Sequence, residues 1–165
     1  HKPTADIFID DKGMSVEEWK KTIPLKKGIV AGAFDIIHPG YIRMFNDAKE
    51  YCNHLTVALH EDPSTERHNK LKPVQTVEER KEILLALRDV DDVVIYKEEE
   101  TFLSYLKDYE IRFLGTDYLN GNYTGKNNLI DIIWLDRNHD YSSTKLKRDI
   151  YNNVKGTMIL GVNYD

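Results

Sequence analysis

The feature that most constrains the fold is the alternation of short apolar runs with longer amphipathic stretches. Short continuous apolar runs indicate buried strands, and apolar positions three and four apart indicate helices. Strands are predicted at residues 28–34, 54–60, 93–96, 111–114 and 130–135, and helices at 39–51, 76–88, 101–109 and 142–153. Because strands alternating with helices form βαβ units, we expect an α/β fold with a mainly parallel five-stranded sheet and helices on both faces.

The chain is long enough for one domain, preceded by an extension and followed by a tail. Its 165 residues are within the usual size of a single hydrophobic core. In the extension, residues 1–25, we predict a short strand at 7–9, a turn at 10–13 and a helix that begins at the capping box of Ser15 and Glu18. The main domain is assigned to residues 26–155, and the tail, 156–165, is given one short strand at 158–160.

The charge and cysteine content exclude several classes of protein. The chain has 23 Lys and Arg against 28 Asp and Glu, and this acidic balance does not suit non-specific nucleic-acid binding. The single cysteine, Cys52, allows no internal disulfide and no multi-cysteine metal site. No apolar run approaches the roughly 20 residues of a membrane span, and no signal peptide is visible. We therefore expect a cytoplasmic protein with no membrane span and no nucleic-acid partner.

The end of the first predicted strand has the features of a phosphate site. The segment 32–41 reads GAFDIIHPGY and joins that strand to a helix. A glycine after a buried strand lets a ligand approach the backbone, and Pro39 suits the first turn of a helix. His38 lies beside a helix N-terminus, where backbone N–H groups and the helix dipole favour an anion. The alternative is an ordinary strand–turn–helix with a capping histidine.

A second segment, 137–145, follows the last strand and opens the last helix. It reads RNHDYSSTK, in which Ser142 or Ser143 can cap the helix and leave N–H groups for a phosphate. Arg137 could supply a bidentate charge. A plain Ser/Thr cap is the alternative.

Two further loops hold charged residues on the ligand side of a parallel sheet. Lys70 and Lys72 follow the second strand and could neutralise phosphates or be ordinary solvated lysines. Gly115 and Asp117 follow the fourth strand and could form only a turn. Each signal is weak alone, but their order at consecutive ligand-side loops is specific.

On these residues the chain resembles the cytidylyltransferases of the HxGH nucleotidyltransferase superfamily, most closely the glycerol-3-phosphate cytidylyltransferase type. The resemblance covers residues 27–150 and implies a Rossmann-like nucleotidyltransferase fold. The GxFD strand end matches residues 32–35, the HxGH motif matches 38–41 and the RTEGISTT signature is similar to 137–144. The helix arginines of the family fall on Arg80 and Arg88.

The resemblance implies transfer of CMP from CTP to a small phosphorylated alcohol, with release of pyrophosphate. Positioning and electrostatics would carry such a reaction, since the acceptor phosphate is already an anion. Mg²⁺ would bridge phosphate oxygens without a side-chain cage, and related enzymes imply a homodimer. The resemblance assigns catalysis to His38, Tyr41, Lys72 and Arg137 and acceptor binding to Lys70, Arg80 and Asp62. Nucleotide contacts fall on Gly32, Ala33, Phe34, Asp35, Gly40, Arg88, Gly115, Asp117, Ser142, Ser143 and Thr144.

The chain departs from the family at Tyr41, where the motif has its second histidine. A tyrosine can donate a hydrogen bond but has no positive charge near neutral pH. The enzyme could be slower, could use another acceptor, or could have become a nucleotide-binding protein without turnover. His139 could supply a replacement imidazole. ATP in place of CTP is a further alternative, because adenylyltransferases share the motif frame.

Overall fold

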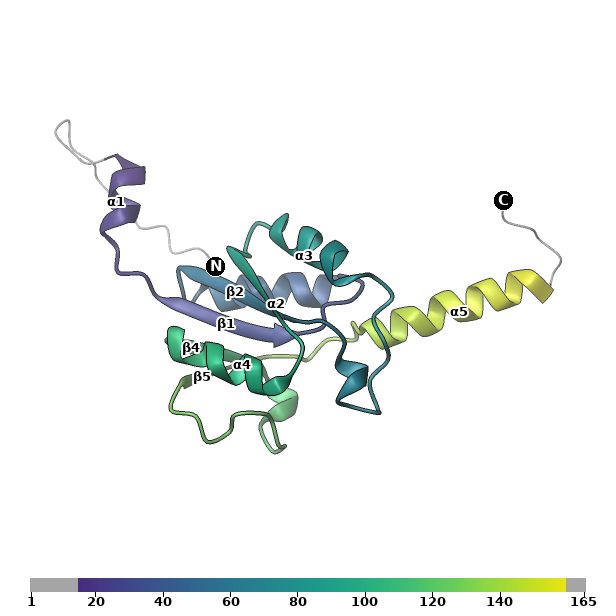
Figure 1. Ribbon diagram of the computed structural model, residues 1–165. Coiled ribbons are helices and arrows are strands. Elements are labelled where there is room, and N and C mark those ends of the chain that lie inside the picture. The colour runs from purple at the N-terminus through teal and green to yellow at the C-terminus, as the bar shows by residue number, and fades with distance from the viewer. Residues whose placement is uncertain (1–14, 160–165) are drawn as a thin grey trace.

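A computed structural model describes residues 15–159 and contains one parallel five-stranded sheet (Figure 1). The strands are β1 (Lys27–Gly32), β2 (His54–His60), β3 (Asp92–Tyr96), β4 (Ile111–Gly115) and β5 (Asp131–Leu135). Their order in the sheet is β3-β2-β1-β4-β5, and every neighbouring pair is parallel. The predicted α/β class and five-stranded parallel sheet are therefore confirmed.

The strand order places a topological switch point between β1 and β4. From β1 the chain adds β2 and β3 on one side, and then crosses to add β4 and β5 on the other. In open parallel sheets the loops diverge at such a point and leave a crevice at the carboxyl ends of the strands. The loops after β1 and β4 are therefore placed for ligand binding.

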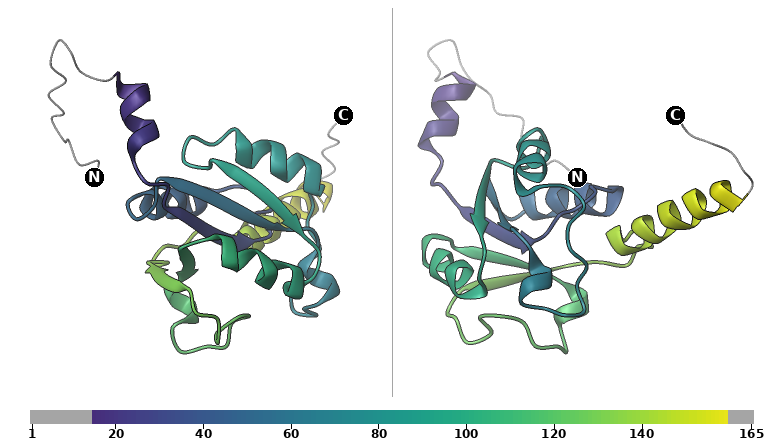
Figure 2. Two further views of the ribbon diagram at one scale, coloured as in Figure 1. Left: turned by 60° about the vertical axis from the view of Figure 1, so that its left-hand side comes forward. Right: turned by 45° about the vertical axis from the view of Figure 1, so that its right-hand side comes forward.

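Helices cover both faces of the sheet, as expected. Helices α2 (Pro39–Lys49) and α3 (Val77–Leu85) lie on one face, and α4 (Glu99–Tyr105) lies on the other (Figures 1 and 2). Phe45 and Leu84 from the first pair pack with the strand residues of one core cluster, whereas Phe102 of α4 packs with Ile29 and Ala58 in a second. The sheet therefore has two separate cores, and its carboxyl edge is left to the loops.

Short 3-10 turns complete the described elements. They are η1 (Pro63–Thr65), η2 (Leu106–Asp108) and η3 (Thr116–Tyr118). Glu61 and Asp62 separate η1 from β2, and η3 follows directly after β4. No helix in residues 15–159 has both the length and the apolar character needed to cross a membrane.

The two outermost helices extend away from the sheet on opposite sides (Figure 1). Helix α1 (Val16–Thr22) begins at the predicted capping box of Ser15 and Glu18, and both of its hydrogen bonds form. Helix α5 (Ser143–Ile159) continues past the predicted end at residue 153, so residues 158–159 are helical and the predicted strand there is wrong. A helical glycine, here Gly156, costs only about 1 kcal/mol relative to alanine, too little to end a helix. The strand and turn predicted at 7–13 lie outside the described residues.

Candidate functional site

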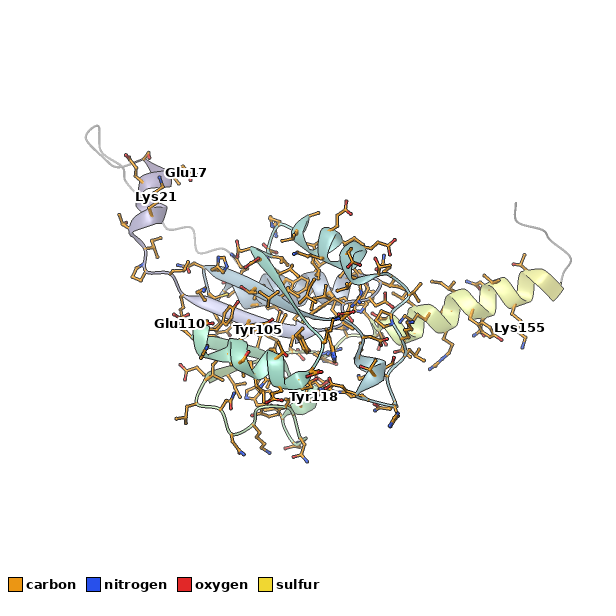
Figure 3. The ribbon with its side chains drawn as sticks, in the orientation of Figure 1. Glu17, Lys21, Tyr105, Glu110, Tyr118 and Lys155 are labelled. Atoms are coloured by element: carbon orange, nitrogen blue, oxygen red, sulfur yellow. The ribbon has the colours of Figure 1, made fainter. Side chains whose placement is uncertain are left out.

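A cleft of about 850 Å³ lies at the carboxyl edge of the sheet. It is bounded by the loops after β1, β2, β4 and β5, by the ends of β3 and α4, and by the first turn of α5. Figure 3 shows Tyr118 of η3 at this edge, whereas Glu110, which precedes β4, lies toward the opposite edge. The cleft thus occupies the position that the topology predicts for a ligand.

The loop after β1 forms one wall of the cleft and has an unusual backbone. Phe34 and Ile36 adopt positive φ angles of 47° and 58°, which non-glycine residues rarely do. The carboxylate of Asp35 accepts the N–H groups of Val74 and Gln75 at 2.7 and 3.0 Å, and these bonds hold the loop against the segment before α3. Surrounding contacts therefore over-determine a strained loop, as is common at ligand sites.

Asp35 is buried and also forms an ion pair across the cleft. Its Oδ2 lies 2.5 Å from Nζ of Lys147, on the second turn of α5. Burial acts to raise the pKa of Asp35, but the hydrogen bond from Lys147 and the two amide bonds outweigh it and hold the pKa below its usual value. Lys147, which sequence reasoning missed, thereby links the start of α5 to the loop after β1.

The HPGY segment, residues 38–41, and the DYSS segment, residues 140–143, meet at the mouth of the cleft. The Tyr41 hydroxyl lies 3.1 Å from Oγ of Ser143, although the two residues are 102 positions apart. A side chain at Gly40 would come within 2.5 Å of the ring of His139, so only glycine allows this approach. His139, proposed from the sequence as a spare imidazole, lies with its ring centre 6.4 Å from that of His38.

His38 begins α2 and is buried beneath the ring of Tyr41. The two rings stack with centres 3.9 Å apart, and Tyr41 lines the cleft. Burial, with smaller effects of His139 and Arg137, lowers the pKa of His38. The imidazole is therefore neutral near neutral pH, and its Nδ1 is buried with no hydrogen-bond partner.

Arg137 and the first turn of α5 form the opposite wall. Arg137 Nη1 lies 3.8 Å from the carboxylate of Asp117, and any side chain at Gly115 would collide with both residues. The hydroxyl of Ser142 accepts the N–H of Lys145 and so caps α5. The cleft therefore faces the positive end of a helix dipole.

The cleft is cationic although the chain is acidic overall. Its lining contains five side chains that carry a positive charge, Arg67, Lys70, Arg112, Arg137 and Lys147. It contains two carboxylates, Asp35 and Glu99, and both are paired, with Lys147 and Arg67 respectively. Such a lining attracts a polyanion.

The structure brings most of the predicted residues to this cleft. Those that line it are Gly32, Ala33, Phe34, Asp35, Tyr41, Lys70, Gly115, Arg137, Ser142, Ser143 and Thr144. His38, Gly40 and Asp117 contact these lining residues from behind or beside them.

The structure does not bring four more of the predicted residues to the lining of the cleft. The Arg88 side chain is 72% exposed, pairs with Asp89 and borders a separate hollow beside α2, so it does not reach the cleft. Arg80 is buried and donates to five backbone carbonyls, those of Ala33, His60, Glu61, Gln75 and Thr76, so it holds the strand ends rather than an acceptor.

The other two of these residues, Asp62 and Lys72, lie in the loop after β2. The carboxylate of Asp62 accepts the N–H and the hydroxyl of Ser64 and caps η1, so its oxygens are used locally. Lys72 is exposed on the surface, and the lysine of this loop that lines the cleft is Lys70.

Sequence reasoning missed a further part of the cleft, built by His60, Arg67, Tyr96, Glu99 and Arg112. A detectable signal existed for Arg112, because a charged residue inside an otherwise apolar strand, IRFLG, requires an explanation. Ligand atoms of His60, Glu66 and Glu99 lie within 4.8 Å of one another, close enough for a metal ion. Existing bonds occupy them, however, since His60 Nε2 lies 3.0 Å from the Lys97 carbonyl and Glu99 pairs with Arg67 at 2.6 Å.

Comparison with known proteins gives a consistent result. The model of a family described as cytidylyltransferase-like matches residues 29–159. The bifunctional protein HldE of Rhodopseudomonas palustris strain HaA2 is 34% identical over 134 residues, which cover 74% of this chain and 27% of that protein. HldE of Hyphomonas neptunium is 40% identical over 82 residues, covering 49% and 17%. The chain thus spans less than a third of the length of these relatives.

A solved structure shares the fold. The lipopolysaccharide core biosynthesis protein from Thermoplasma volcanium GSS1 superposes with a TM-score of 0.54 and covers 72% of this chain and 100% of its own. Its sequence identity is 20%, so this likeness concerns the fold alone.

Proposed function

Because the chain belongs to the cytidylyltransferase-like family, we propose that it is a nucleotidyltransferase that joins CMP from CTP to a small phosphorylated alcohol such as glycerol 3-phosphate. The observation that supports this best is the meeting of the HPGY and DYSS segments, through Tyr41 and Ser143, at one cationic cleft. This cleft has room for two polyanions and has a helix N-terminus in its wall.

In the proposed reaction an oxygen of the acceptor phosphate attacks the α-phosphorus of the nucleotide. The bond from that phosphorus to the bridging oxygen breaks, and pyrophosphate leaves with the electron pair. No proton has to be removed from the attacking oxygen, so a general base is not needed. The protein must instead align two anions and stabilise charge in an in-line transition state.

The chain's own groups suit this task. Arg137 and the first turn of α5, Ser142 to Thr144, would hold the β- and γ-phosphates through charge and hydrogen bonds. Lys70 would neutralise the incoming acceptor phosphate. The Tyr41 hydroxyl lies at the cleft surface and would donate to a phosphate oxygen in exchange for its bond to Ser143.

His38 would assist as a neutral imidazole. Its pKa is lowered chiefly by burial, so it can donate a hydrogen bond without adding charge. In the structure the stacked Tyr41 ring covers it, and direct contact with a phosphate requires that ring to move. His38 and Tyr41 therefore act as a pair.

Mg²⁺ would be bound through the nucleotide. Both carboxylates of the described cleft lining, Asp35 and Glu99, are paired with cations and offer no dedicated cage. This fits an ion that is held by phosphate oxygens and waters. When bound, it would draw negative charge away from the triphosphate.

Two alternatives differ in what they predict. An adenylyltransferase would release pyrophosphate with ATP rather than CTP. A repurposed binding protein would bind a nucleotide in the cleft without turnover, and Tyr41 in place of the second histidine favours this alternative.

The test is release of pyrophosphate with Mg²⁺, CTP or ATP, and a pool of small phosphorylated alcohols, sugars and amino alcohols. We expect release only when nucleotide and acceptor are both present, and expect Arg137→Met to lower kcat/KM about 100-fold. Arg148→Met, which removes an exposed arginine elsewhere on α5, is the matched control.

Tyr41→His separates the remaining outcomes. Activity in the native chain would mean that the tyrosine supports turnover. Activity in Tyr41→His alone would support the repurposed binding protein. Release with ATP alone would replace CTP in the proposal, and silence of both chains with both nucleotides would refute it.

A further inference from the structure

A buried arginine without an anionic partner lies in the cleft, away from the proposed phosphate subsites. Arg112 is the second residue of β4 and is 4% exposed, yet it lines the cleft. Its neighbours in the strand, Ile111 and Phe113, pack in the core on the face of α2 and α3, whereas Arg112 contacts Phe102 of α4. Its guanidinium therefore lies on the face of the sheet that α4 covers.

Arg80 shows how this protein satisfies a buried arginine that has a structural role. Arg80 is also buried and donates to five backbone carbonyls. Arg112 donates one hydrogen bond, at 2.5 Å, to the carbonyl of Thr124. Within residues 15–159 no carboxylate lies within ion-pair distance of it. Most of its donors are therefore open to a ligand in the cleft.

Aromatic groups hold this guanidinium in place without neutralising it. It lies between Phe102 and Tyr123, at 4.9 and 5.3 Å from the ring centres, and Tyr123 is itself held edge-on against Trp134. Gly125, with a φ of 78°, lets the loop pass so closely that a side chain there would come within 3.0 Å of Arg112 Nη1. The loop is thus folded around the cation.

A buried, incompletely paired charge is expensive in free energy, and burial lowers the pKa of Arg112 accordingly. Proteins rarely keep such a group unless a partner arrives. A nucleobase could accept hydrogen bonds from Arg112 but carries no charge, so it would not neutralise the buried cation. The proposed triphosphate subsite lies elsewhere, at Arg137 and the first turn of α5.

The depth of Arg112 in the sheet separates it from the reacting phosphate. Its backbone lies three residues before Gly115, where β4 ends, and a strand rises about 3.3 Å per residue. The guanidinium thus belongs to a deeper part of the cleft, with Tyr96, His60 and the Arg67–Glu99 pair in its walls. A ligand group bound there is distinct from one at the carboxyl edge.

We propose that Arg112 binds a second anionic group of the acceptor, a carboxylate or a second phosphate, several atoms away from the phosphate that attacks. This inference rests on the proposed function and narrows it. The acceptor is then a phosphorylated alcohol that is anionic at both ends, and glycerol 3-phosphate is too short to be the preferred one.

The first test does not depend on turnover. The Nε–Hε signal of Arg112, identified by its loss in Arg112→Met, is followed by NMR while inorganic phosphate or acetate is added to the native chain. A saturable shift with phosphate alone supports a second phosphate, and a shift with acetate supports a carboxylate. Arg148→Met is the control and should show the same shifts as the native chain. If neither anion shifts the Arg112 signal of the native chain, the proposal is refuted.

The second test uses acceptors that have one or two anionic groups. Arg112→Met should raise KM for the doubly anionic acceptor about 10- to 100-fold, the effect of losing one or two charge-assisted hydrogen bonds, and leave KM for the nucleotide within twofold. Its Tm should not fall, because an unpaired buried charge is removed. Equal rises in both KM values together with a lower Tm would make Arg112 a structural anchor only and would refute the inference.

Two controls keep these outcomes distinct. If Arg112→Met does not fold, Arg112→Lys is used instead, because it retains the positive charge. The proposal then requires that KM for the doubly anionic acceptor be higher in Arg112→Lys than in the native chain, while binding of that acceptor is still detectable. If no nucleotide is ever consumed, the proposed function fails, but the NMR titration still decides whether Arg112 binds an anion.

Discussion

Removing the positive charge of Lys147 should destabilise the protein and also loosen the proposed nucleotide site. The Asp35–Lys147 pair is mostly buried, with side-chain exposures of 4% and 16%. Removing one partner of such a pair costs about 3–5 kcal/mol, because the other charge stays buried. Asp35 keeps its bonds to the amides of Val74 and Gln75, so we expect the lower end, about 3 kcal/mol, for Lys147→Met.

The dependence on pH gives this prediction its sharpest form. The pKa of Asp35 is lowered in the folded state, so its ionisation stabilises the protein above the ordinary value of 3.8 and stops doing so as the pH falls through the lowered pKa. Lys147→Met removes the main cause of that lowering, and burial then favours the neutral acid. The stability difference between native and variant should therefore be largest at pH 7 and shrink below about pH 4.

The assay is urea unfolding at pH 7 and at about pH 3, below the ordinary pKa of an aspartate, with Lys145→Met as the matched control. Lys145 is exposed on the same helix, so its replacement should change the free energy of unfolding by less than about 0.5 kcal/mol. KM for the proposed nucleotide substrate should rise in Lys147→Met, because the loop after β1 loses its ion pair with α5. Equal stability losses for the two lysine variants, or a loss that does not depend on pH, would refute the reasoning.

Three further predictions follow from other contacts. Tyr41→Phe removes the hydroxyl that bonds Ser143 and should lower kcat about 10- to 100-fold in the pyrophosphate assay while Tm changes by less than about 3 °C; an unchanged kcat would contradict the role of Tyr41. Arg80→Met leaves five carbonyls with a lost donor and should lower the free energy of unfolding by about 4 kcal/mol in urea, against little change in Arg148→Met. Burial raises the pKa of the Cys52 thiol to about 11, so at pH 8 a thiol reagent should label native Cys52 about 100-fold more slowly than the unfolded chain, and equal rates would show that this core is open.

Local rules predicted the elements of the fold well because their causes are local. The capping box predicted at Ser15 forms, and the helix predicted from residue 76 begins directly after Thr76, which caps it. The end of α5 was not predicted, since Gly156 and the apolar residues after it are compatible with either a helix or a strand. In the structure residues 157–159 pair with no strand of the sheet, and α5 continues to Ile159.

The site was predictable only as far as it depends on which loops meet. Parallel βαβ units bring the carboxyl ends of the strands to one edge of the sheet, and the loops of Asp35, Gly115 and Arg137 lie there. The sequence does not predict which side-chain N–H groups remain available to a ligand, because this depends on contacts between distant segments. Arg80 and Arg112 look alike in a sequence, but only folding shows that carbonyls saturate one and leave the other available.

The substitution at Tyr41 has a physical consequence that a motif comparison does not reveal. A tyrosine at this position stacks on His38 and shields it, and its hydroxyl joins α2 to the start of α5. If a second cation were essential near the reacting phosphate, the shielded and neutral His38 could not supply it, since burial lowers its pKa. In the proposed reaction the positive charge must then come from Lys70, Arg137 and the proposed Mg²⁺. Raising the ionic strength should therefore increase KM for the nucleotide steeply, and a KM that does not depend on salt would show that fixed hydrogen bonds, rather than these charges, hold the triphosphate.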